Sequence, residues 1–532
     1  MGLLGLGWME WPVWVALALA AIYKLGTWNY NYFTARGVKT MKTVPFFGSF
    51  AGTTFKKQSF ASLIEDSCKN FKGERYVGLF QFLNPILMIK DPELIKRVTV
   101  KDFDHFVDHV QSISKNADPL MGRNLFFLRG EKWRDLRSTL SPAFTSSKMR
   151  NMFVFIDGCG QQLADYLQSE IDKEAPGKPF VVEMKDLFTR YTTDVIGTAA
   201  FGININSLKV KDNDFYRMGK QITSFSNIRM LKMVGFLIIP KILEFLGITF
   251  FTKEEHKFFT DLVEDTVTTR DREGIVRHDM IDLLMQARRG ELKGDGEEEE
   301  QVSIGEGKAK KLNLSLEDIA AQALGFFFAG FDSASGMLSF ASILLAMHED
   351  VQSKVQQEVD EILGDDRKVT YDKLQKTKYL DMVLAETLRM YPPTPSVDRM
   401  CTKTFTIPAS DKHPEYTLQP GDQIAVPIFG IHHDPEYFPD PKKFDPERFS
   451  DENKANINPY AYLPFGLGPR MCLGHRFVML ETKVALIHIL SRFSLVVVEK
   501  TPLPLKLSAE SFSLGVEGGF WIGVKPRENE PT

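Results

Sequence analysis

The chain has 532 residues, of which 43% are apolar and 25% are charged, and its formal net charge is −4. This balance is typical of a globular protein with a sizeable core, and it argues against a nucleic-acid partner, which would require a basic surface. The four cysteines lie far apart and form no CxxC pair, so neither a disulfide framework nor a zinc knuckle is indicated.

Residues 1–23 form an apolar stretch whose one charged side chain is Glu10. As a helix this stretch would be about 30 Å long, close to the hydrocarbon thickness of a bilayer. Basic residues begin only at Lys24, so the positive-inside rule places the rest of the chain in the cytosol. We predict a retained membrane anchor; a cleaved signal peptide is the alternative, although its usual N-terminal positive charge is missing. Glu10 leaves open whether the anchor crosses the whole bilayer.

Residues 24–45 are predicted to be a linker and residues 46–528 a single catalytic domain, because no convincing boundary interrupts the second range. Helical periodicity dominates the domain, and the strand-like stretches at 423–427 and 495–498 are short. Charged runs at 293–300 and 308–311 are typical of a solvated loop. The predicted fold class is mainly α with small β sheets.

Two segments in the first half of the chain carry distinct patterns. Trp133 and Arg137 are four residues apart, which places them on one face of a predicted helix, a spacing that an ordinary amphipathic surface also shows. Residues 230–251 are strongly apolar, but Pro240 and Lys241 interrupt them, so we do not expect a membrane span. This segment is either core or a surface patch that dips into lipid.

A long helix is predicted from Ser315, which caps it with Asp318 as the capping-box partner, to about Met347. Gly330 weakens the helix, and Ser333 can bond back to a carbonyl and bend it, so we expect a widened turn that admits a small molecule and water. Asp332 beside the Ser333 hydroxyl could relay protons. The alternative is an ordinary buried helix with small residues for packing.

The stretch from Phe465 to Gly474 contains one cysteine, Cys472, two residues after Arg470 and just before an apolar helical pattern. Free N–H groups, a nearby cation and a helix N-terminus all favour a thiolate, although a buried structural cysteine is the simpler alternative. Upstream, Glu386 and Arg389 have the spacing of a pair on one helix face.

The segment 465–474 resembles the cysteine loop of the cytochrome P450 family at every fixed position. The W-x-x-x-R pair, the Ala329–Ala334 segment, Glu386-x-x-Arg389 and the later Pro446–Phe449 motif follow the family order, and residues 435–449 resemble insect microsomal P450s of the xenobiotic-metabolising type. The resemblance implies the P450 fold, with one large haem domain behind the membrane anchor.

The resemblance also implies roles for individual residues. Cys472 would be the axial ligand of the iron of haem b, with Phe465 against the ligand loop and Gly474 allowing close approach. Trp133, Arg137, Arg399 and Arg470 would hold the haem propionates. Glu386, Arg389 and Arg448 would form a buried structural network under the haem. Asp332 and Ser333 would deliver protons, although the family usually has threonine at the Ser333 position. The predicted substrate pocket contains Phe126, Phe127, Phe327, Ala329 and Val397.

The implied activity is a monooxygenase that inserts one oxygen atom from O2 into an apolar xenobiotic or endogenous lipophile. Electrons would come from NADPH through a separate cytochrome P450 reductase, with cytochrome b5 as a second candidate donor and Lys132, Arg134 and Arg137 as candidate docking residues. The implied location is the endoplasmic reticulum membrane, with the 230–251 segment touching lipid and the catalytic domain facing the cytosol. The alternatives are a reductase-independent isomerase or dehydratase and a non-catalytic lipophile-binding haem protein.

Overall fold

The computed structural model describes residues 10–110, 113–224, 226–292, 314–510 and 513–527. The predicted loop at 293–300 and 308–311 lies outside these residues. The helices are α1 (Glu10–Thr27), α2 (Ala51–Thr54), α3 (Phe60–Lys69), α4 (Pro92–Lys96), α5 (Pro119–Gly122), α6 (Gly130–Leu140), α7 (Ser146–Ile171), α8 (Met184–Ile196), α9 (Asp214–Thr223), α10 (Asn227–Ile238), α11 (Pro240–Phe245), α12 (Lys253–Glu273), α13 (Met280–Arg289), α15 (Leu316–Met347), α16 (Glu349–Leu363), α17 (Tyr371–Leu374), α18 (Lys378–Met390), α19 (Ile428–His432) and α20 (His475–Leu490).

The strands are β1 (Tyr76–Gln81), β2 (Asn84–Ile89), β3 (Phe180–Glu183), β4 (Val397–Met400), β5 (Phe405–Ile407), β6 (Tyr416–Leu418), β7 (Gln423–Val426), β8 (Phe493–Val496) and β9 (Trp521–Pro526). They form sheets of order β1-β2-β7-β4, β3-β9-β8 and β5-β6. β2 and β7 are parallel, so the largest sheet joins the start of the domain to its last third. The prediction of a mainly helical chain with small sheets is confirmed, and both predicted strands exist, the second beginning two residues earlier than expected.

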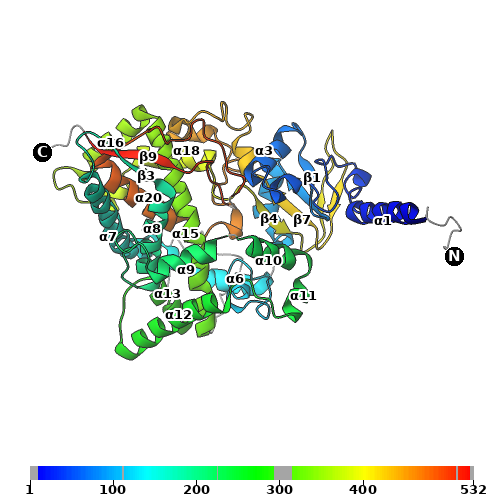
Figure 1. Ribbon diagram of the computed structural model, residues 1–532, viewed down its shortest axis with the longest axis horizontal. Helices are drawn as coiled ribbons and strands as arrows, with labels where there is room; N and C mark the ends of the chain where they lie inside the picture. The colour runs from blue at the N-terminus through cyan, green and yellow to red at the C-terminus, as the bar shows by residue number, and fades with distance from the viewer. Residues whose placement is uncertain (1–9, 111–112, 225, 293–313, 511–512, 528–532) are drawn as a thin grey trace.

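The long helix α15 runs through the middle of the molecule (Figure 1) and packs against α8, α12, α5 and α9. The predicted cap is present: Ser315 Oγ accepts from the N–H of Asp318 at 3.1 Å, and the Asp318 carboxylate accepts from the N–H of Ser315 at 2.9 Å. The helix is long and apolar enough to cross a membrane, but most of it is buried inside the protein. An apolar helix that neighbours surround on many sides is a core element.

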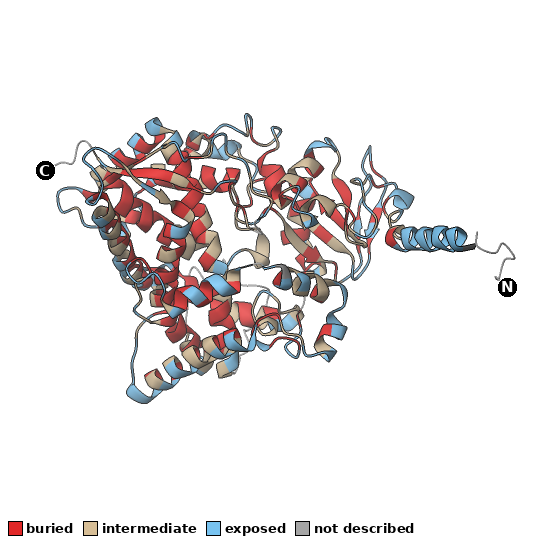
Figure 2. Cartoon of the chain, viewed as in Figure 1, coloured by how far each residue is buried: buried red, intermediate tan, exposed pale blue. Residues whose placement is uncertain are grey.

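The N-terminal helix α1 projects away from the rest of the molecule, and Figure 2 shows it exposed along nearly its whole length. It continues four residues beyond the predicted boundary at residue 23. The stretch expected to be a linker is only partly free, because Phe33 is buried against Phe80 and Thr40 bridges to Gly78 of β1. Burial of this apolar ring explains why the chain packs here before residue 46.

Glu481 is a buried carboxyl group in the middle of α20, and neither of its oxygens has a hydrogen-bond partner among the described residues. Burial raises the pKa of Glu481 well above its usual value, so folding takes up a proton. Stability then falls as pH rises above the unfolded pKa, by at most about 1.4 kcal/mol per pH unit. We expect Glu481→Gln to raise the thermal midpoint at neutral pH, with the gain vanishing near pH ~4.5. A gain that is constant with pH would contradict this explanation.

Candidate active site

The segment from Phe465 to Gly474 folds as a tight loop that ends at the start of α20. The N–H of Cys472 donates to the carbonyl of Phe465 at 2.9 Å. Gly466 and Gly468 have φ values of 75° and 71°, and a Cβ on Gly468 would stand 1.9 Å from the Thr99 carbonyl oxygen. Other residues would be strained at these positions, so glycine has a direct structural reason at both.

Cys472 lies deep in the protein, but its side chain is exposed because it opens onto a large cavity. The other three cysteines are buried and do not line this cavity. Burial raises the pKa of the Cys472 thiol, while the Gly474 N–H and the Arg137 charge act in the opposite direction without outweighing it. The loop alone therefore does not make a thiolate, contrary to the sequence-based expectation, and a bound metal cation would be needed to remove the proton.

Arginines form a basic wall beside the cysteine loop. The guanidinium of Arg470 lies 3.9 Å from the centre of the buried Trp133 ring and donates to the carbonyls of Val107 and Leu128 at 2.9 Å each. Arg137 donates to the Met471 carbonyl at 2.9 Å. Burial lowers the pKa of Arg470 to about 9, but the group stays protonated at neutral pH. These contacts bring Trp133, Arg137 and Arg470 together, as the sequence predicted.

Arg399 completes the predicted group. It is buried in β4, and burial lowers the pKa of Arg399 to about 10, as it does for Arg137, so both remain charged at neutral pH. Arg399 and Arg137 both line the cavity. The Nε atom of each is buried without a hydrogen-bond partner in the described part of the chain. These two unused donors indicate that an anionic group belongs in the cavity.

Two further residues of the wall were missed by sequence reasoning. Arg129 and His109 line the same cavity, and Arg129 has a third buried Nε without a partner among the described residues. Arg129 is the N-cap residue of α6, with extended backbone, so helical spacing does not indicate it, and nothing in the sequence marks His109. The His109 ring stacks on Phe126 at 4.3 Å, and its Nδ1 lies 3.1 Å from Asp398.

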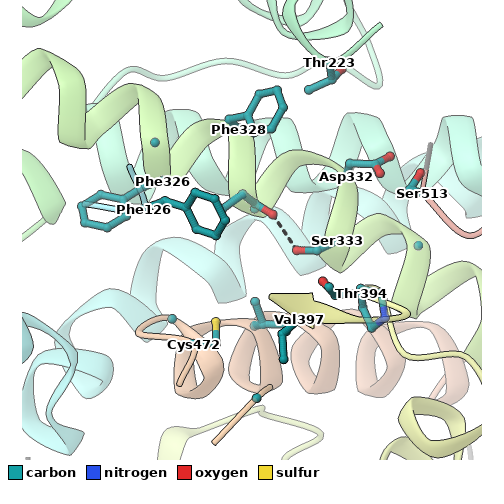
Figure 3. A pocket seen from close by; sticks show the side chains of 18 of the residues that line it. Phe126, Thr223, Phe326, Phe328, Asp332, Ser333, Thr394, Val397, Cys472 and Ser513 are labelled. Atoms are coloured by element: carbon teal, nitrogen blue, oxygen red, sulfur yellow. Dashed lines mark hydrogen bonds between the residues drawn. The ribbon is translucent and has the colours of Figure 1, made fainter. Parts of the chain in front are cut away.

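Asp332 and Ser333 reach the cavity from α15, but they do not contact each other (Figure 3). The Ser333 hydroxyl donates to the Ala329 carbonyl at 2.6 Å. Asp332 Oδ1 lies 2.8 Å from Lys185 Nζ on α8, and its side chain points toward Ser513. Burial opposes ionisation of Asp332, but Lys185 and Ser513 hold the pKa of this carboxyl below its usual value. The predicted hydrogen bond from the Ser333 hydroxyl to a carbonyl of its own helix is present. α15 nevertheless stays α-helical here, so the expected widened turn is not found.

The comparisons with known proteins agree with this geometry. Residues 39–521 match the family model of cytochrome P450. The chain is 48% identical to cytochrome P450 9e2 of Blattella germanica over 98% of both chains. It is 37% identical to probable cytochrome P450 9f2 of Drosophila melanogaster, over 98% of this chain and 100% of that one. It is also 40% identical to probable cytochrome P450 6a13 of Drosophila melanogaster, over 94% of this chain and 96% of that one. The chain belongs to the cytochrome P450 family.

This P450 is therefore a monooxygenase that uses haem with an axial cysteine thiolate. The charges of the basic wall fit the two carboxylates of haem. Arg129, Arg137, Arg399 and Arg470 carry four positive charges, and Asp108 and Asp398 carry two negative charges, which leaves a net +2. Burial lowers the pKa of His109, so that ring is neutral. Two propionates would neutralise the wall and use the three unpartnered Nε atoms.

The cavity of this P450 has a volume of about 1370 Å³, and most of its lining is apolar. Phe126, Phe127, Ala329 and Val397 line it, as do Phe326 and Phe328. Phe327 does not, so its assignment to the pocket is wrong. Its ring is fully buried against Phe201, Phe215 and Phe259, because the helical twist of α15 turns this one ring of the three toward α9 and α12.

The three residues of the expected structural network are together in this P450. Arg389 donates to Glu386 through Nε and Nη2 at 2.7 and 2.9 Å, and both side chains are completely buried. Arg448 Nε lies 3.4 Å from Glu386 Oε1, and the N–H of Asp445 donates to the same oxygen at 3.0 Å. The Glu386–Arg389 pair thus joins α18 to the Pro446–Phe449 motif.

The three candidate docking residues of this P450 differ in accessibility. Lys132 is exposed, and Arg134 is partly exposed but paired with Asp104 at 2.6 Å. Arg137 is buried and faces the cavity, so it cannot dock a partner. The prediction that Arg137 serves both roles is wrong for docking, because helical spacing turns it toward Trp133 and away from Lys132.

Proposed function

We propose that this P450 oxidises apolar small molecules and that Cys472 holds the haem iron. The observation that carries the proposal is the position of Cys472, which faces the same cavity as Asp332 and Ser333 from a different wall (Figure 3). The basic wall beside Cys472 supplies counter-charges for the propionates through Arg129, Arg137 and Arg399. Trp133 and Arg470 hold this wall in position, because Arg470 lies over the Trp133 ring and its N–H groups donate to backbone carbonyls.

Bound haem iron with a thiolate ligand supplies the activation of O2 and the insertion of one oxygen atom into the substrate. The residues of the chain would bind, orient and move protons. Ser333 can turn its hydroxyl from the Ala329 carbonyl toward the cavity and donate a proton there. The Lys185 ion pair keeps the Asp332 carboxylate charged and held away from Ser333. After leaving Lys185, Asp332 would take up a proton from solvent water and pass it to the Ser333 oxygen, which restores the hydroxyl.

The substrate we propose is apolar and comparable in size to a plant toxin or an insecticide. The cavity lining is rich in phenylalanine, and its arginines are gathered at the wall assigned to the propionates. A mostly apolar lining with few polar groups selects ligands by shape and burial. The names of the relatives specify no substrate, so the proposal rests on the cavity itself.

We also propose that α1, α10 and α11 contact the endoplasmic reticulum membrane while the catalytic domain faces the cytosol. α10 and α11 turn one side to the cavity and leave large apolar residues exposed on the other, namely Ile228, Leu231, Ile238, Ile239, Ile242, Phe245 and Leu246. Phe245 is 89% exposed, which is costly in water and favourable at a lipid surface. α1 and α11 lie toward the same side of the view in Figure 1.

The test of the proposed function is a reconstitution of the full chain with haem, phospholipid, NADPH and cytochrome P450 reductase. We expect oxygenated product from apolar test compounds only when NADPH and reductase are both present. Lys132 is the candidate contact of the reductase, and cytochrome b5 is the second candidate electron donor. Product without reductase would favour an isomerase or dehydratase. Tight binding without any product would favour a lipophile-binding protein, and either outcome would contradict the proposal.

We expect Ser333→Thr to lower the amount of hydrogen peroxide released per NADPH consumed. Serine lacks the methyl group that restricts the rotamer of threonine, so its hydroxyl is held less firmly in the orientation needed for proton delivery. The structure shows the hydroxyl turned to its own helix at Ala329. The measurement is the ratio of peroxide to NADPH in both proteins under the same conditions, and an unchanged ratio would rule out this account of Ser333.

A further inference from the structure

Two segments that are far apart in the sequence line the cavity and are joined by one buried carboxylate. The first is α5, which contributes Leu120 and Met121, and the second is the pair Phe250 and Phe251 just before α12. Asp118 caps α5, since its Oδ1 accepts from the N–H of Met121 at 3.0 Å. Its Oδ2 accepts from the N–H of Phe251 at 3.0 Å and lies 3.2 Å from His256 Nε2.

The α12 side of this junction is firmly held. Thr252 and Glu255 form a capping box at the start of α12. The buried Glu255 also accepts from Arg229 of α10 at 2.6 Å, and Arg229 donates to the Gln221 carbonyl at the end of α9 at 3.0 Å. α5, by contrast, is a helix of four residues. Asp118 is therefore the point at which the short helix α5 is tied to the start of α12.

The chemistry of Asp118 makes this tie hard to break. Its side chain is completely buried, and the three N–H donors at Met121, Phe251 and His256 surround it. Moving α5 away from α12 would remove two of these donors and leave a buried charge under-bonded. His256 borders a side pocket of about 440 Å³ that Lys115, Arg123 and Glu317 also line, so the tie can be reached from outside the main cavity.

We propose that Asp118 and His256 form a clasp that sets the rate at which small molecules pass into and out of the cavity between α5 and α12. The inference rests on the proposed function only in that the cavity takes a small-molecule ligand. Asp118 and His256 themselves are absent from the cavity lining. A clasp that closes the route without touching the ligand raises both the association and the dissociation barrier and leaves the equilibrium affinity unchanged.

The test uses the full haem-loaded chain and stopped-flow measurement of phenylimidazole binding, followed by the shift of the haem absorption band. Asp118→Asn keeps a good helix cap but removes the charge, and we expect both rate constants to rise about tenfold. His256→Leu should also raise both, while His256→Gln, which keeps an N–H donor, should stay close to the wild type. Asp91→Asn is the control, because Asp91 also caps a short helix, α4, but does not line the cavity.

Unchanged association and dissociation rate constants in both Asp118→Asn and His256→Leu would overturn the clasp. A change in only one of the two rate constants, which would alter the affinity, would also overturn it. If Asp118→Asn does not fold, the contrast between the two His256 variants decides alone. A wild-type protein that shows no haem band with phenylimidazole would instead overturn the proposed function, and the clasp with it.

Discussion

We expect Asp332→Asn to keep its haem and its thiolate-type spectrum while product formation falls about a hundredfold. The amide has the same shape as the carboxyl group, but it cannot take up a proton and pass it on. The measurement is NADPH-dependent product formation in the reconstituted system. Asp214→Asn is the control, since Asp214 lies exposed on α9 and pairs only with Arg217 at 2.7 Å among the described residues. Product formation by Asp332→Asn within twofold of the wild type would contradict the proton-delivery role.

The pH dependence gives this prediction a second readout. Lys185 holds the pKa of Asp332 below its usual value against the effect of burial, so Asp332 is ionised throughout the neutral range. No pH effect from this group is then expected above about pH 4. In Lys185→Met only the Ser513 hydrogen bond still opposes burial, so the pKa of Asp332 rises, the group protonates at a higher pH and a new inflection should enter the pH–rate profile. The inflection should be absent when Asp332→Asn is added.

Glu386→Gln should yield little haem-loaded protein. The carboxylate accepts two hydrogen bonds from Arg389 and one from the N–H of Asp445, and neither charged side chain has solvent access. Removing one partner of a buried ion pair costs about 3–5 kcal/mol, because the remaining charge is left uncompensated. The measurements are the ratio of haem to protein after purification and the thermal midpoint.

Glu447→Gln provides the matched control for this change. Glu447 lies in the same later motif as Arg448, but it is half exposed and pairs with Lys354 at 3.4 Å on the surface. An exposed pair contributes less than about 1 kcal/mol, so haem content should stay at the wild-type level. Equal haem content in Glu386→Gln and the wild type would show that the buried pair is dispensable.

The sequence predicted those parts of the site that depend on local spacing. The Ser315 capping box and the start of α20 after Gly474 follow from hydrogen bonds within a few residues, and both are present. The back-bond from Ser333 to the Ala329 carbonyl is also local. The widened turn was predicted from the same residues and is not found, because the α-helical hydrogen bonding of α15 continues past Gly330.

The parts that sequence reasoning missed depend on contacts between distant elements. Packing against α9 and α12 decides which of the three consecutive phenylalanines faces away from the cavity, and that residue is Phe327. Asp332 points to Lys185, which lies 147 residues earlier in the chain. His109 joins the basic wall through Asp398, which no local pattern could indicate. Family resemblance supplies roles for the motifs along the chain, but such pairings are set by the packing of this particular chain.

The most direct test of the account is the absorption difference spectrum of the reduced, CO-bound protein, recorded beside Cys472→Ala. Cys68→Ala serves as the control, because Cys68 is buried away from the cavity. We expect the thiolate-type shifted band in the wild type and in Cys68→Ala, and its loss in Cys472→Ala. An imidazole-type band that is the same in all three proteins would contradict Cys472 as the iron ligand and the site built around it.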